Sequence, residues 1–141
     1  MKRWIRITLT VLTAAVGLTA AAGGAALIVG AFASSDAGGI APSPSYLTGS
    51  PFTSYVVPGL LLAVIVGGTH LLAAFLVGQE SPAGPFATAL AGFGLLIWIF
   101  VQMMFIPFSP LQAAYFIAGL AEIGLTLLGL GLMRRNTLAA S

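Results

Sequence analysis

Residues 110–133 read "PLQAAYFIAGLAEIGLTLLGLGLM", and this stretch decides the fold. Glu122 is its one charged side chain. A membrane-spanning helix needs about 20 mostly apolar residues. Inside lipid every backbone amide must find its hydrogen bond within the protein, and a helix achieves this within a single segment. The run therefore predicts a transmembrane helix that carries an acid near its middle.

Three further runs of the same character precede it, at about residues 5–32, 55–77 and 85–106. The chain is 59% hydrophobic and 6% charged, whereas about a quarter of the residues of a soluble domain are charged. We therefore predict one domain over residues 1–141, an all-α transmembrane four-helix bundle. Cysteine is absent and there is one histidine, which leaves no thiolate or histidine-rich metal site, and no cofactor is expected.

The basic side chains gather at the two ends of the chain. Lysine and arginine flank membrane spans mainly on the cytoplasmic side, so both termini are predicted to be cytoplasmic and the loop at about 34–54 external. This clustering at the ends gives no nucleic-acid patch, and the lipid bilayer is the expected partner. The basic residues are Lys2, Arg3, Arg6, Arg134 and Arg135.

Local signals qualify the first two spans. The sequence "AFA" at 31–33 resembles the cleavage site of a secretory signal, but the apolar run before it is nearly twice the usual length of about 7–15 residues, which favours an uncleaved helix. Ser50 before Pro51 suits the start of a short helical lead-in over 51–57. Pro58 removes one backbone donor and predicts a kink in the second span.

Glu122 lies on a face of mainly small and polar side chains. Residues three, four and seven positions away share its helix face, whereas the opposite side carries Phe116, Leu120 and Ile123. Small residues allow helices in membranes to approach closely, so this face predicts contact with another helix. It comprises Tyr115, Ala118, Gly119, Leu125, Thr126 and Gly129.

His70 lies on a similar small face of the second span, and the first span carries a third small stripe. The third span is bulkier around Gln102. Packing between helices is therefore expected at small residues in three spans. The candidate packing positions are Gly17, Gly24, Ala63, Gly67, Gly119 and Gly129.

An acid near the middle of the membrane costs about 2.5–3.5 kcal/mol on insertion scales, so Glu122 is expected to be either protonated and hydrogen-bonded or ionised and paired. At 1.5 Å per residue, Glu122 lies near the midplane and His70 roughly 5 Å closer to the cytoplasm. The possible partners of Glu122 are His70, Tyr115, Thr126, Gln102 or a group in a second subunit.

Several functions remain open. The leading hypothesis is a non-enzymatic packing, accessory or assembly protein, either as a homo-oligomer or with a membrane-protein partner. The alternative is a proton-coupled small transporter or channel that uses Glu122 with His70, because transporter sites commonly lie near the midplane. A remote alternative is an intramembrane enzyme with this pair as acid and base.

The stretches "SPFTSYVVPGLLLAVIVG" at 50–67 and "IWIFVQMMFIPFSPLQAAYFIAGL" at 97–120, with "AGGAALIVG" at 22–30, resemble a group of small four-span bacterial membrane proteins without an assigned activity. The resemblance implies a four-span fold and a bacterial membrane. That group often has an acidic residue before the tyrosine, where this chain has Ser54. The matching residues are Ser50, Pro51, Phe52, Tyr55, Pro58, Gly59, Leu60, Trp98, Gln102 and Gln112.

Overall fold

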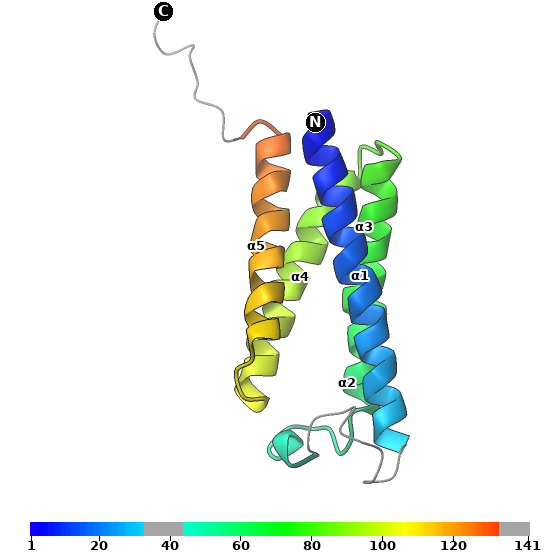
Figure 1. Cartoon of the computed structure of the whole chain (residues 1–141), viewed down its shortest axis with the longest axis vertical. Coiled ribbons are helices and arrows are strands. Elements are labelled where there is room, and N and C mark those ends of the chain that lie inside the picture. Colours follow the sequence, from blue (N-terminus) through cyan, green and yellow to red (C-terminus); the bar gives the residue numbers. More distant parts are fainter. Residues whose placement is uncertain (33–43, 133–141) are drawn as a thin grey trace, which may run out of the picture.

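The structure, a computed structural model, describes residues 1–32 and 44–132. Every regular element in these residues is helical, and four helices are long and apolar enough to cross a membrane (Figure 1). The predicted all-helical fold with four such helices is confirmed. The elements are α1 (Arg3–Phe32), η1 (Pro44–Leu47), α2 (Val56–Leu61), η2 (Leu62–Gly67), α3 (Gly68–Gly78), α4 (Gly84–Phe105) and α5 (Pro110–Gly129).

The four helices run up and down around a common centre. α1 packs along α2, η2 and α3, while α4 packs against both α3 and α5, and α5 returns to α1. α3 and α5 therefore occupy opposite corners of the bundle. We call the end that holds the start of α1 and the last turn of α5 the basic end, because Lys2, Arg3 and Arg6 lie there (Figure 1). The opposite end is the loop end.

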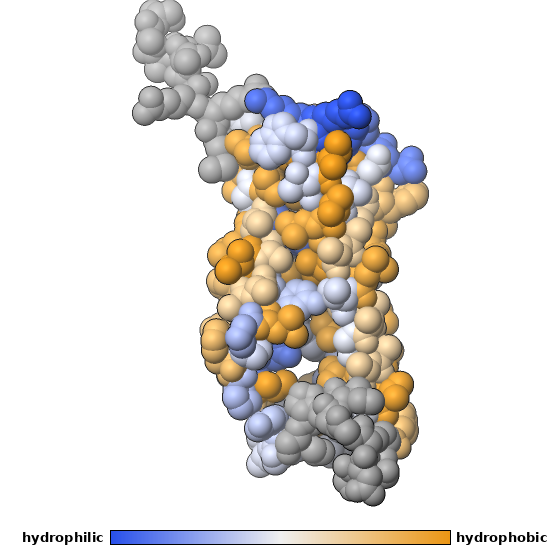
Figure 2. Space-filling view, in the orientation of Figure 1, coloured by the Kyte–Doolittle hydropathy of each residue, from blue (hydrophilic) through white to orange (hydrophobic). Residues whose placement is uncertain are grey.

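The surface matches a lipid environment. Hydrophilic side chains gather at the basic end, and hydrophobic ones cover the flanks of the helices (Figure 2). Many bulky apolar side chains point outward, including Phe75, Ile97 and Phe100. A contiguous apolar surface of this extent is rare on soluble monomers. By length and composition, four helices of the described residues are therefore suited to cross a membrane, which suggests a multi-pass membrane protein.

The second membrane helix differs from its expected form. Residues 51–55 are not helical, and the Ser50 hydroxyl donates to the carbonyl of Leu47 rather than starting a helix. The expected lead-in is therefore absent. Pro58 is the third residue of α2, where an amide donor has no partner within the helix, so the proline needs no kink. The irregularity lies further on, in the π-helical turn of η2.

Small residues bring the helices together within the chain itself. A Cβ atom added to Gly24 of α1 would lie 2.4 Å from the carbonyl oxygen of Gly59 and 2.7 Å from Cβ of Ala63. Similarly, a Cβ atom added to Gly119 of α5 would lie 3.2 Å from the carbonyl oxygen of Gly92 on α4. Glycine is required at such points because backbones approach too closely for a side chain.

The remaining packing positions also face inward. A Cβ atom added to Gly17 would lie 2.9 Å from the side chain of Leu71, and one added to Gly67 would lie 3.2 Å from the backbone nitrogen of Ala21 of α1. A Cβ atom added to Gly129 would lie 3.0 Å from the side chain of Met1. The small faces predicted from sequence are therefore occupied by contacts between helices of one chain.

Several predictions concern residues beyond this part of the chain. Residues 34–43 of the predicted external loop lie outside the described residues, as do Ala33 of the "AFA" sequence, Arg134 and Arg135. The last helix ends at Gly129, before the predicted end at about 133, and Leu130 to Leu132 form a turn. At the basic end, Arg6 forms an ion pair with Glu80 in the turn between α3 and α4.

Candidate functional site

His70 and Glu122 meet inside the bundle. The Nε2 atom of His70 lies 3.0 Å from Oε2 of Glu122, and both residues are 0% exposed. His70 is eight residues before the end of α3 and Glu122 seven before the end of α5, so at 1.5 Å per residue both lie about 10–12 Å from the basic end. Their bond crosses the diagonal of the bundle, from α3 to α5.

The other nitrogen of the ring fixes the tautomer. Nδ1 of His70 lies 2.7 Å from the backbone carbonyl oxygen of Val66, one turn earlier. A carbonyl oxygen can only accept a hydrogen bond, so Nδ1 carries a proton and donates it. Nε2 is then left to face the carboxyl group, either as an acceptor or as a second donor.

One proton is therefore shared between Nε2 and the carboxyl group. If Glu122 holds it, the acid O–H donates to a neutral imidazole; if His70 holds it, an imidazolium faces a carboxylate. Both arrangements have a net charge of zero. The second carboxyl oxygen, Oε1, is buried without a hydrogen-bond partner among the described residues. A carboxylate is stabilised by several donors, so a single contact favours the uncharged arrangement.

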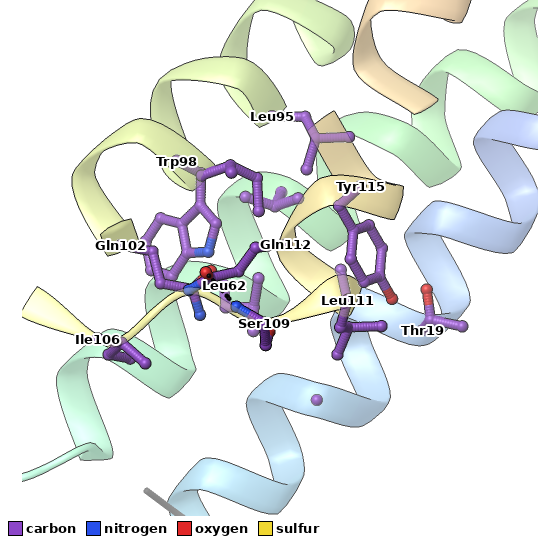
Figure 3. A pocket seen from close by; sticks show the side chains of 14 residues that line it. Thr19, Leu62, Leu95, Trp98, Gln102, Ile106, Ser109, Leu111, Gln112 and Tyr115 are labelled. Carbon is purple, nitrogen blue, oxygen red and sulfur yellow. Dashed lines mark hydrogen bonds between the residues drawn. The ribbon is translucent and has the colours of Figure 1, made fainter. Parts of the chain in front are cut away.

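The other candidate residues are not partners of the carboxyl group. The Thr126 hydroxyl donates to the backbone carbonyl of Glu122, at 2.7 Å, rather than to its side chain. Tyr115 and Gln102 line a cavity nearer the loop end together with Trp98 (Figure 3). The structure thus divides the five predicted polar residues into a buried pair with Thr126 beside it, and a separate cavity.

α4 supplies a small face that sequence reasoning overlooked. We expected bulky packing around Gln102, but the first half of α4 buries small residues. A Cβ added to Gly92 would lie 3.5 Å from Cβ of Glu122, so α4 closely covers the acid. The buried small residues of α4 are Gly84, Ala87, Thr88, Ala91 and Gly92. They are spaced three, four and seven residues apart, a sequence pattern that indicates one helix face.

Apolar clusters lie on both sides of the pair. Towards the loop end, Val16, Val66 and Leu95 belong to one buried cluster. Towards the basic end, Ile5 and Val77 belong to another. Beyond the first cluster lies the cavity of Tyr115 and Gln102, of about 310 Å³. Beyond the second lies a smaller cavity of about 220 Å³, beside Arg6 and Glu80. Neither His70 nor Glu122 lines these two cavities.

A further cavity of about 240 Å³ at the loop end is lined mainly by apolar side chains, among them Phe52 and Phe105. Tyr55, which directly precedes α2, also lines it. Burial raises the pKa of the Tyr55 hydroxyl above its ordinary value, and the neighbouring Tyr46 adds to this. Tyr55 therefore stays protonated and uncharged at neutral pH.

The chain matches no protein-family model, no curated protein and no solved structure. Its class accordingly rests on the fold and on the chemistry of the residues themselves. The described residues contain no group of three or more histidine, cysteine, aspartate or glutamate side chains that could hold a metal ion. What the central site offers is a pair of side chains that holds one exchangeable proton in a fully enclosed position.

Proposed function

We propose that the chain is a non-enzymatic multi-pass protein of a bacterial cytoplasmic membrane, and that its His70–Glu122 pair carries protons across that membrane, as in a small proton channel. The observation that carries this proposal is the enclosed contact between the His70 imidazole and the Glu122 carboxyl group, with Nε2 3.0 Å from Oε2 and both residues 0% exposed. Intramembrane ionisable residues commonly mark ion or proton pathways.

The surroundings of the pair support this function. Apolar clusters separate it from a cavity on either side, so the two cavities do not join through the pair. Proton transfer through the pair itself, rather than through a continuous file of water, requires such a closed centre. The pair itself stays uncharged overall, which lowers the cost of its burial.

The orientation is part of the proposal. Lys2, Arg3 and Arg6 at the basic end favour the cytoplasmic side for that end, which would place the C-terminal end of α5 there as well. The bacterial location depends on the resemblance of residues 50–67 and 97–120 to four-span bacterial proteins. The cavity of Tyr115 and Gln102 would then lie in the external half of the membrane.

Glu122→Gln is the variant that tests proton transfer through the pair. The glutamine amide can still donate an N–H group to Nε2 of His70, but it cannot release a proton at neutral pH. Purified protein in liposomes with an internal pH-sensitive dye should conduct protons down an imposed gradient, and Glu122→Gln should not. Glu80→Gln removes an exposed acid at the basic end and should behave as the original chain. Equal proton flux in Glu122→Gln and the original chain would refute proton transfer through the pair.

A second candidate is the accessory or assembly protein, and one observation favours it. The pair touches no cavity of those described above, so it can serve as a fixed clamp between α3 and α5. A partner or a second copy would then have to use the bulky outer faces, because the small faces are occupied within the chain. In this case Glu122→Gln should leave both co-purifying partners and oligomeric state unchanged, while Glu122→Leu should weaken the bundle.

A further inference from the structure

The cavity in the loop half of the bundle has the features of a ligand site. It lies between α1 and α5, with η2 and α4 behind it, and encloses about 310 Å³, at the small end of the range for ligand pockets. In the space-filling view the surface is hollowed between α5 and α1 in the half away from the N-terminus (Figure 2). Because this opening lies on the flank of the bundle, it faces the lipid of a membrane.

Hydrogen-bonding groups without partners line this cavity. Among the described residues, the indole N–H of Trp98, the side-chain amide of Gln102 and the hydroxyl of Tyr115 form no hydrogen bond. The Tyr115 hydroxyl points across the cavity towards Thr19 (Figure 3), but the Thr19 hydroxyl donates to the carbonyl of Ala15 on its own helix. Lipid tails cannot pair with such groups, and leaving them unpaired at this depth is costly.

The chemistry of these groups restricts the ligand. Trp98 can only donate, and Gln102 and Tyr115 can each donate, so the ligand should carry oxygen acceptors. No charged side chain lines the cavity, and an ion would be strongly disfavoured there, so the ligand should be uncharged. The rings of Trp98 and Tyr115 offer faces for stacking on a flat body.

We propose that this cavity binds a small, uncharged, membrane-soluble molecule with a flat body and a carbonyl oxygen, held by Trp98, Gln102 and Tyr115. The ligand enters from the lipid through the opening between α1 and α5. This proposal does not depend on proton transfer through the His70–Glu122 pair, because none of the three residues contacts the carboxyl group of Glu122.

The chain provides its own reporter for the test. It has two tryptophans, Trp4 and Trp98, and Trp4 lies in the first turn of α1 at the basic end. In a Trp4→Phe background, fluorescence therefore reports on Trp98, which lines both this cavity and the neighbouring cavity of Tyr55, and the Tyr115→Phe variant below assigns the signal to this cavity. The probe is a decyl-tailed benzoquinone, which is flat, uncharged and rich in carbonyl oxygens, and which quenches indole fluorescence. It is titrated into liposomes that contain the purified protein, with tail-less tetramethylbenzoquinone as the comparison for entry from water.

Saturable quenching of Trp98 by the tailed probe, with weaker quenching by the tail-less one, supports the proposal. Tyr115→Phe removes only the hydroxyl and should weaken binding by about two- to tenfold, the worth of one hydrogen bond. Tyr46→Phe, outside the cavity, is the matched control and should bind normally. Circular dichroism checks that both variants keep their helices, and Glu122→Gln should bind the probe as the original chain does, whatever its proton flux.

Two results would overturn the proposal. One is quenching that rises linearly with probe concentration and is equal for Trp98 and for Trp4 in a Trp98→Phe background, since that is the signature of a quencher dissolved in lipid. The other is equal affinity in the Tyr115→Phe and Tyr46→Phe variants. Saturable binding of equal strength by both quinones would retain the site but refute entry from the lipid.

Discussion

Replacement of Glu122 by leucine is expected to destabilise the bundle by about 1–3 kcal/mol, the cost of a buried polar atom left without a partner. Leucine fills a similar volume but offers no hydrogen bond to Nε2 of His70. Interhelical polar contacts in membranes average only about 0.6 kcal/mol, because the unfolded chain in the membrane finds other partners. Both residues are 0% exposed, so we expect the loss for this contact to exceed that average and to lie within about 1–3 kcal/mol.

Two companion variants separate the possible causes. Glu122→Gln keeps a donor for Nε2 and should cost less than about 1 kcal/mol if the pair is uncharged, whereas disruption of a buried ion pair costs about 3–5 kcal/mol. The double variant His70→Leu with Glu122→Leu replaces both partners by apolar groups and should recover most of the stability lost in either single variant.

Unfolding by sodium dodecyl sulfate in mixed micelles, followed by circular dichroism, measures these differences. Glu80→Gln serves as a control for loss of an acid, since an exposed ion pair contributes about 0–1 kcal/mol. The reasoning fails if the losses in the two leucine single variants simply add in the double variant, because two coupled residues do not behave additively. A loss in Glu122→Gln as large as in Glu122→Leu would refute the uncharged arrangement of the pair.

Three further predictions concern packing, backbone and orientation. Gly24→Ala should cost about 1–3 kcal/mol from overpacking, since its Cβ would lie 2.4 Å from the carbonyl oxygen of Gly59, while Gly94→Ala, with nothing within 4 Å, should be neutral or slightly stabilising in the same unfolding assay. Glu80 has a φ of 57°, so Glu80→Gly should raise the thermal midpoint, because a left-handed conformation costs about 1–2 kcal/mol whereas an exposed ion pair contributes about 0–1 kcal/mol; a lower midpoint would refute this reasoning. Because the chain lacks cysteine, single cysteines at Ala83 and Thr48 can be labelled in intact cells: an impermeant maleimide should reach Thr48→Cys but not Ala83→Cys, and the reverse would overturn the proposed orientation.

The sequence predicted the four helices well, because each apolar run is long enough to span a membrane and its backbone can pair only as a helix. It also placed Glu122 and His70 on small faces. It left the pairing of these two residues open for a physical reason. A helical wheel gives the direction of a side chain from its own helix axis, but not which helix stands opposite, and the diagonal arrangement of α3 and α5 arises only from the packing of all four helices.

The helical wheel also failed to predict the cavity of Tyr115 and Gln102. Tyr115 and Glu122 are seven residues apart and share a face of α5, so the wheel grouped them. Seven residues also span about 10 Å along a helix, and over that distance the bundle changes from closely packed to hollow. Gln102 and Trp98 come from α4 and reach the same cavity. A site formed by several helices at one depth in the bundle cannot be predicted from the faces of the separate helices.

The π-helical turn of η2 explains how the second membrane helix both packs along α1 and directs His70 towards Glu122. Gly59, Ala63, Gly67 and Leu71 all meet α1 through Gly17, Ala21 or Gly24, although they are four residues apart. In a regular helix each step of four residues turns about 40° too far to stay on one line, because a turn takes 3.6 residues. A π turn winds fewer degrees per residue and so keeps this line against α1.

The change in winding at the π turn also sets the direction in which His70 points. Because Leu71 lies on the line against α1, the preceding residue points about 100° away from it, into the centre of the bundle and towards Glu122. Val66, within the same π turn, accepts the hydrogen bond from Nδ1 that fixes the tautomer, and it also lines the cavity of Tyr115. One residue of the π turn thus both lines the cavity and holds the ring of His70 through its backbone carbonyl.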